Sequence, residues 1–159
     1  MIDLNTTIKV YAEKINMWLY KGKVIESIED MPKDSFGFIY EVIHNPTGQK
    51  YLGKKVLQFN RKLPPLKGQK RKRKVVKESD WRTYYGSHQT IKTLIKEGKQ
   101  EEFSREILQF VPTKKLLTYF ECKYLFIKEV LEHGEYINDN ILAKFYRKDF
   151  NYETQSDNT

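Results

Sequence analysis

The chain has few of the features expected of a secreted or membrane protein. It has a single cysteine, Cys122, so no intramolecular disulfide can form and no cysteine-rich zinc site is available. No apolar run approaches the length of a transmembrane helix, and the first residues lack the basic-then-apolar pattern of a signal peptide. We therefore expect one domain of ordinary size that acts in the reducing cytoplasm, with no membrane partner and no evident protein partner.

Acidic residues are absent from residues 61–77, although the whole chain has 21 of them. The same stretch holds nine of the 29 lysines and arginines, so it accounts for the whole net charge of +8. Such a block attracts a polyanion and releases its counterions, which predicts strongly salt-dependent nucleic-acid binding. The alternatives are a solvated loop that only aids solubility, or a basic targeting signal.

The basic block is interrupted by Pro64-Pro65 and by Gly68, which favours a mobile loop over a continuous helix. Its densest part is expected to contact nucleic acid directly and consists of Lys70, Arg71, Lys72, Arg73 and Lys74.

Two tyrosines stand in a predicted β-hairpin. Residues 38–43 and 50–56 are rich in β-branched and aromatic side chains, and the sequence Asn-Pro-Thr-Gly at 45–48 is typical of a turn. Tyr40 and Tyr51, eleven positions apart, can therefore come near one another from neighbouring strands. Two phenols held together beside cations can serve phosphodiester chemistry, although tyrosine in a strand is usually a packing residue.

Helix and strand patterns alternate after the basic block. Ser87 resembles a helix N-cap, Gly98 is a typical helix stop, and residues 103–111 are a predicted strand. Thr113 can cap the longest helix, which is expected to run to about Glu132. Its predicted buried stripe consists of Leu116, Phe120, Tyr124, Ile127 and Leu131.

The order strand, strand, helix, strand, helix predicts an α/β (α+β) domain with a central three-stranded antiparallel sheet flanked by helices. We expect this domain to span residues 36–142, with the basic insertion at 61–77. Residues 1–35 read as an accessory extension with a small hairpin around Gly22, and residues 143–159 as a C-terminal tail that is polar from Asn151.

The two tyrosine blocks resemble the signature of the GIY-YIG nuclease superfamily. Here the blocks are Phe38-Ile39-Tyr40 and Tyr51-Leu52-Gly53, with Gly37 one place upstream of the first. An arginine, a glutamate within a long helix and an asparagine follow in the family's order. They are Arg61, Glu121 and either Asn138 or Asn140. The segments 80–87 and 121–126 are similar to those of phage-encoded SegE-like endonucleases.

The resemblance implies that one tyrosine helps to activate the attacking water, as a general base or as a positioning group. Family precedent favours Tyr40 over Tyr51. A phenol, with an ordinary pKa of about 10, must be made more acidic to act as a base at neutral pH. Lys54 and Lys55, directly after the second block, are the cations that could lower the pKa and contact DNA.

The remaining roles follow from the resemblance in the same way. Arg61 would bind the scissile phosphate and neutralise charge in the transition state, with Arg82 or the two lysines as alternatives. Gly53 and one of Asn138 and Asn140 would form the edge of the active site.

Glu121 also stands out from its local sequence. Its helical neighbours three and four positions away include no cation, and it flanks the predicted apolar stripe. A partly buried carboxylate needs a partner, which can be a metal ion or a cation from another part of the chain. Mg²⁺ (or Mn²⁺) suits a site with few protein oxygens because it keeps most of its waters. Glu129, which likewise lacks a local cation, is the rival candidate.

His88 lies at the start of the second predicted helix, where backbone N–H groups favour an anion, so it could assist proton transfer or contact DNA. Together the residues predict a metal-dependent DNA endonuclease, phage-encoded and active in the host cytoplasm, with a homing-like or DNA-processing purpose. The alternatives are an inactive nucleic-acid-binding module on the same fold and an RNA-directed protein.

Overall fold

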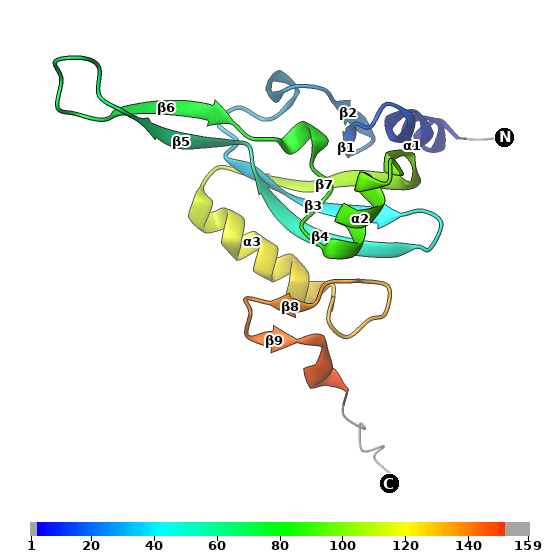
Figure 1. Ribbon diagram of the computed structural model, residues 1–159. Helices are drawn as coiled ribbons and strands as arrows, with labels where there is room; N and C mark the ends of the chain where they lie inside the picture. Colours follow the sequence, from blue (N-terminus) through cyan, green and yellow to red (C-terminus); the bar gives the residue numbers. More distant parts are fainter. Residues whose placement is uncertain (1–2, 152–159) are drawn as a thin grey trace, which may run out of the picture.

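The computed structural model describes residues 3–151, and its centre is a five-stranded mixed sheet with the strand order β2–β1–β7–β3–β4 (Figure 1). The strands of this sheet are β1 (Trp18–Tyr20), β2 (Lys23–Ile25), β3 (Gly37–His44), β4 (Gln49–Val56) and β7 (Phe103–Val111). The α-helices are α1 (Leu4–Lys14), α2 (Gln89–Lys96) and α3 (Lys114–Ile127). Short 3-10 turns lie at Ile28–Asp30, Trp81–Thr83, Gln100–Glu102 and Arg147–Phe150.

The predicted tyrosine hairpin is confirmed. β3 and β4 pair antiparallel, with Tyr40 opposite Gly53 and Val42 opposite Tyr51. The turn between them ends at Gly48, whose φ of 72° is in the left-handed region that glycine adopts without strain. β4 is an edge strand of the main sheet, and residues 135–138 cover part of this edge: the N–H of Lys50 donates to the carbonyl of Glu135, and the carbonyl of Lys50 accepts from Ile137.

The expectation of a three-stranded sheet is wrong, because the hairpin β1–β2 joins the same sheet. β1 runs parallel to β7, with Leu19 opposite Glu106, and antiparallel to β2. The indole of Trp18 is 1% exposed and donates a hydrogen bond of 2.7 Å to the carbonyl of Trp81. Strands of three residues carry too little alternation to be assigned to a distant partner from sequence alone.

The two faces of the sheet bury different side chains, as alternation along a strand requires. Phe38 and Tyr40 belong to the core under α2, whereas Ile39 and Leu52 belong to the core under α3. The predicted strand at 103–111 is confirmed as β7. No helix within residues 3–151 is long and apolar enough to cross a membrane.

Both long helices differ in detail from the prediction. α2 is capped by His88, whose ring accepts from the backbone N–H of Thr90, and not by Ser87. Thr113 caps α3 as predicted, but the helix ends at Ile127 rather than near Glu132.

The buried face of α3 is rotated from the predicted stripe. Leu116 is 40% exposed and Ile127 is 66% exposed, whereas Leu117 and Leu125 are buried. Because 117, 121 and 125 repeat at four residues, Glu121 lies on the packed face itself.

The basic block is not a loop but a β-hairpin of two strands, β5 (Gln58–Leu63) and β6 (Arg73–Glu78), that pair only with each other. We call residues 58–78 the arm. The arm extends away from the rest of the molecule (Figure 1), and every residue in it except the half-buried Leu63 is exposed. Pro64-Pro65 and Gly68 lie in its turn, where they interrupt no strand.

A further hairpin, β8 (Asn140–Ile141) and β9 (Phe145–Tyr146), follows α3. The guanidinium of Arg147 ties it to the preceding loop through bonds to the carbonyls of Val130, Leu131, His133, Tyr136 and Asn138. Of the predicted tail, residues 152–159 lie outside the described residues.

Candidate active site

The two signature tyrosines lie together on the α2 side of strands β3 and β4. The centres of the Tyr40 and Tyr51 rings are 6.4 Å apart. The Tyr51 hydroxyl is 2.7 Å from Oγ of Ser87, and the Tyr40 hydroxyl is 3.5 Å from that of Tyr84. Three phenols and one alcohol therefore converge beside the edge strand.

Two glycines make room for these phenols. A Cβ atom at Gly53 would be 2.6 Å from the Tyr40 hydroxyl, so the ring of Tyr40 crosses over Gly53 of β4. A Cβ atom at Gly86 would be 3.1 Å from the ring of Tyr51, and Gly86 also has a φ of 113°. Both positions need the absence of a side chain, which explains Gly53 in the second signature block.

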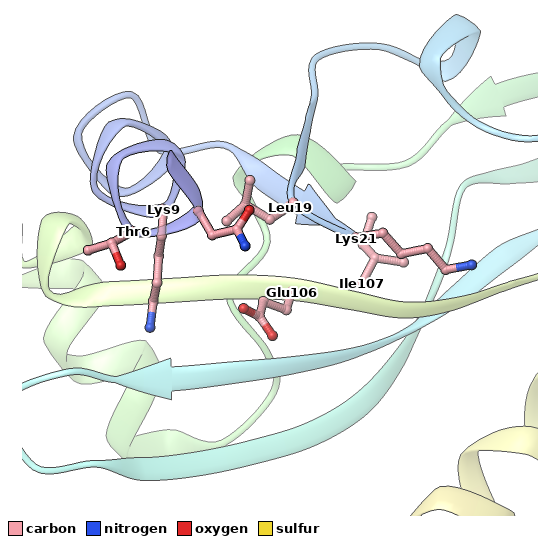
Figure 2. Close-up of a pocket in the computed structure, with 8 residues that line it drawn as sticks. Thr6, Lys9, Leu19, Lys21, Glu106 and Ile107 are labelled. Atoms are coloured by element: carbon pink, nitrogen blue, oxygen red, sulfur yellow. The ribbon is translucent and has the colours of Figure 1, made fainter. Parts of the chain in front are cut away.

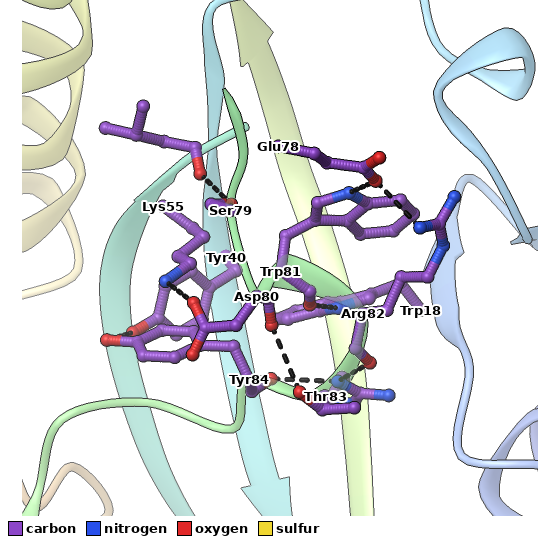
Figure 3. Close-up of polar contacts among 12 residues, drawn as sticks. Trp18, Tyr40, Lys55, Glu78, Ser79, Asp80, Trp81, Arg82, Thr83 and Tyr84 are labelled. Carbon is purple, nitrogen blue, oxygen red and sulfur yellow. Dashed lines mark hydrogen bonds and ion pairs between the residues drawn. The ribbon is translucent and has the colours of Figure 1, made fainter. Parts of the chain in front are cut away.

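The loop that carries Tyr84 is held close to β4 (Figure 3). The ammonium group of Lys55 pairs with Asp80 and lies 3.9 Å from the centre of the Tyr84 ring. The Trp81 side chain is fully buried and donates to the carboxylate of Glu78 at 2.7 Å. A buried anchor and a cation–π contact thus fix the position of Tyr84.

Arg105 on β7 binds the same loop through hydrogen bonds to its backbone carbonyls. Its guanidinium is buried, donates to the carbonyls of Arg82 and Tyr84 at 2.9 and 2.8 Å, and also donates to the carbonyl of Asn16. Burial lowers its pKa to about 10, so it stays charged at neutral pH. Arg105 is a positioning residue that the sequence did not reveal, because its partners are backbone carbonyls far apart in the chain.

Glu121 reaches the opposite side of β4 from α3. Its carboxylate is 3.7 Å from the ammonium of Lys54, and Lys54 also donates to Thr118 at 2.9 Å. Side chains alternate along a strand, so Lys54 points to the Glu121 side while Lys55 points to the tyrosine side. The sequence allows Glu121 two possible partners, a metal ion or a cation from another part of the chain. Lys54 is such a cation.

A cavity of about 370 Å³ is lined by residues from both sides of β4. Its lining includes Tyr51, Glu121, His88 and Asn138. The amide of Asn138 bonds to both the N–H and the carbonyl of Leu52, at 3.1 and 2.8 Å, which fixes this wall to β4. Nε2 of His88 lies 3.2 Å from the carboxylate of Asp139.

A slightly larger cavity lies elsewhere, between α1, β1 and β7 (Figure 2). It is lined in part by Lys9, Lys21 and Glu106, and by no signature residue. The chemistry-bearing side chains gather at the smaller cavity.

Comparison with protein families agrees with this geometry. A family model described as "Putative endonuclease segE, GIY-YIG domain" matches residues 18–141. The chain belongs to this family of GIY-YIG nucleases. The match begins at the first residue of β1 and covers both tyrosine blocks and Glu121. Comparison with curated proteins and with solved structures gave no significant match.

Burial makes the phenols of this GIY-YIG site less acidic, which is opposite to the expected effect of the two lysines. Burial raises the pKa of Tyr40 well above its ordinary value. It also raises the pKa of Tyr51, against a lowering contribution from Ser87. Lys54 and Lys55 do not counter this, because each points to an acid of its own, Glu121 and Asp80.

The carboxylate of Glu121 is the group in this GIY-YIG site best suited to hold a metal ion. Its side chain is 20% exposed, and burial raises its pKa against the lowering effect of Lys54. Within residues 3–151 no group of three or more His, Cys, Asp or Glu could hold a metal. Glu121 shares the cavity with the carboxylate of Asp139, and such a site fits Mg²⁺, which binds through one or two carboxylates, water and phosphate.

Several predicted residues lie away from this group. The chain passes from β4 through Leu57 into β5, so Arg61 stands on the arm, opposite Val75, and not on a helix beside the tyrosines. The half-exposed Arg82 pairs with Glu78 at 2.8 Å.

The candidate asparagines both line the cavity but make different contacts. Asn140 accepts from the N–H of Ala143 in its own turn, whereas the Asn138 amide bonds to the backbone of Leu52 in β4. Glu129 is half exposed and lies 2.8 Å from His133, outside the cavity.

Proposed function

We propose that this protein is a metal-dependent endonuclease that hydrolyses phosphodiester bonds in DNA, encoded by a phage and active in the host cytoplasm. The observation that carries the proposal is the gathering of Tyr40, Tyr51 and Glu121 around strand β4. The arm adds a concentrated positive charge, which favours a polyanionic substrate. Mapping the cleavage site would distinguish a homing-like purpose from a DNA-processing purpose.

Glu121 would hold Mg²⁺ or Mn²⁺, which when bound stabilises negative charge on the phosphate and makes water a better nucleophile. Lys54 lies within 4 Å of Glu121 and is placed to contact a phosphate oxygen there. This position supports Lys54, one of the two lysines named as alternatives to Arg61, for the phosphate-neutralising role. The ammonium is a compact charge that can contact a single oxygen.

Tyr40 and Tyr51 would act as positioning groups. Their raised pKa keeps both phenols protonated at neutral pH, so each can donate a hydrogen bond to an attacking water or to a phosphate oxygen. Tyr51 is half-buried and lines the cavity, whereas Tyr40 is 1% exposed and acts through its contact with Tyr84 and Gly53. Tyr51 is therefore the phenol that would contact substrate directly.

His88 would shape the wall of the site. Its Nδ1 accepts a hydrogen bond from the Thr90 N–H, so the proton of a neutral ring is on Nε2 and faces Asp139. Both nitrogens are occupied, and proton transfer by His88 would first require Asp139 to move.

The test is nicking and linearisation of supercoiled plasmid with Mg²⁺ or with EDTA. We expect metal-dependent cutting that falls at least 100-fold in Glu121→Gln and is retained in the matched control Glu129→Gln, because only Glu121 faces the cavity. Tyr51→Phe removes one hydroxyl and should lower the rate by a smaller factor. Cutting that survives Glu121→Gln would contradict the assignment. No cutting, with salt-sensitive DNA binding, would favour the inactive binding module.

A further inference from the structure

The arm has two chemically different faces. In an antiparallel pair, residues directly opposite each other point to the same side. One face, which we call the arginine face, therefore holds Phe59, Arg61, Leu63, Arg73, Val75 and Lys77. The other, the lysine face, holds Gln58, Asn60, Lys62, Lys74, Val76 and Glu78. Four further cations, Lys67, Lys70, Arg71 and Lys72, lie in the turn.

The lysine face is electrostatically unfavourable when the arm is free. Lys62 stands directly opposite Lys74, and like charges at such positions destabilise a strand pair. Neither lysine forms an ion pair within the described residues. An anion placed between them would remove the repulsion, so this pair points to a phosphate ligand.

The arginine face exposes apolar side chains, which are unfavourable on a ribbon surrounded only by water. Phe59 is 46% exposed and Val75 is 41% exposed, on an arm whose two strands pair only with each other. Apolar side chains alternating with arginines suit a surface that offers both acceptors and methyl groups. The major groove of B-DNA is such a surface, because guanine presents two acceptors and thymine a methyl group.

The base of the arm is fixed to the nuclease core. Leu57 is buried, its N–H donates to the carbonyl of Phe36 at 3.0 Å, and its own carbonyl accepts from Ser79 at 2.8 Å. In sequence the arm lies between Lys55 and Asp80, so it connects strand β4 to the loop that carries Tyr84. DNA held by the arm has a defined position relative to the tyrosines.

We infer that the arm is a β-ribbon that enters the major groove of duplex DNA and selects the site of cutting. This inference rests on the proposed function and assigns Arg61 to target recognition. The major groove, about 12 Å wide, admits a two-stranded ribbon. Arg61 and Arg73 are diagonal neighbours on the arginine face, about 7–8 Å apart.

The distance between Arg61 and Arg73 predicts the spacing of the bases that they contact. This distance corresponds to about two base-pair steps of about 3.4 Å each. Arginine pairs best with guanine, so the preferred site carries two guanines about two steps apart. Lys62, Lys74 and the turn then contact the flanking phosphates.

The test is selection of binding sites from a randomised duplex library by the full-length protein in EDTA, so that binding alone is measured. Wild-type protein should enrich the two-guanine pattern. Arg61→Lys with Arg73→Lys keeps the charge but loses the bidentate contact, so the guanine preference should fall by about 5- to 150-fold per position at an unchanged salt slope. Lys62→Ala with Lys74→Ala should keep the pattern and reduce the slope of log affinity against log salt by about 1.8.

Two controls keep the inference separate from the proposed function. Duplex RNA should compete poorly, since its deep and narrow major groove does not admit the ribbon. Equal competition, no enriched pattern, or a pattern that survives the double Arg→Lys change would overturn the inference. If the protein cuts plasmid but selects no pattern, only the inference about the arm is contradicted. If it selects the pattern in EDTA but never cuts with Mg²⁺, only the proposed function is contradicted.

Discussion

At the scale of single residues, the site combines groups that burial makes harder to ionise. The carboxyl of Glu121 and the phenols of Tyr40 and Tyr51 all have raised pKa values because the surrounding protein excludes water. Such groups cost stability when they must be charged, and active sites commonly retain them for their chemistry. Glu121 is the one that must ionise at neutral pH to bind a metal.

We expect Glu121→Gln to be more stable than the wild-type protein at neutral pH. The pKa of Glu121 is raised in the folded state above its ordinary value of 4.5, so the contribution of this carboxyl to stability is fully present below that pH and is lost as pH rises through the folded-state pKa. Glutamine does not titrate, and Lys54 keeps its bond to Thr118. Urea unfolding of both proteins from pH 4 to pH 8 measures the difference, which should grow with pH.

The exposed Glu129→Gln is the control and should change stability by no more than about 0.5 kcal/mol. A Glu121→Gln protein less stable than wild type at pH 7 would show that the pair with Lys54 outweighs the desolvation of the carboxyl.

At the scale of secondary structure, strand β4 organises the site because its side chains alternate between the two faces of the sheet. Lys54 faces α3 and Glu121, while Lys55 faces Tyr84, and Gly53, directly before them, leaves room for the Tyr40 ring. The signature glycine is therefore a packing requirement. A methyl group at this position would meet the hydroxyl of Tyr40 at 2.6 Å.

We expect Gly53→Ala to displace the Tyr40 phenol. Overpacking of this kind costs about 1–3 kcal/mol of stability. A displacement of about 1 Å near reacting groups can reduce the rate by about 100-fold. Gly134→Ala is the matched control, because a Cβ atom there has no neighbour within 4 Å. Equal plasmid-cutting rates for the two variants would contradict the tight contact.

The hairpin, strand β7 and the cap of α3 were predictable because each depends on local signals: alternation, turn residues and a threonine before a helix. The rotation of the buried face of α3 was not, since both stripes repeat at about the helical period and only packing against β4 selects one. The arm was missed because its strands carry charge on both faces and bury nothing. The Ser87 contact with Tyr51 joins residues 36 positions apart and leaves no pattern in the sequence.

At the scale of the whole molecule, the first strands of the chain form part of the main sheet. β1 pairs with β7 in parallel, and Trp18 packs edge-on against Phe38 and Tyr40 at 5.0 and 5.4 Å between ring centres. Its N–H bond to the carbonyl of Trp81 also ties the N-terminal hairpin to the active-site loop. The core beneath the tyrosines therefore depends on a residue within the stretch that the sequence suggested was accessory.

We expect Trp18→Ala to cost about 3–5 kcal/mol, a large part of the 5–15 kcal/mol that stabilises a typical domain. The loss removes an aromatic side chain that is 1% exposed, whereas Tyr11→Ala, on the exposed side of α1, should change stability by no more than about 0.5 kcal/mol. Urea unfolding followed by circular dichroism compares the three proteins. If Trp18→Ala unfolded at the wild-type midpoint, residues 1–35 would be accessory and the sheet would be stable without β1. A lowered midpoint together with lost plasmid cutting would show that the fold and the tyrosine site share one core.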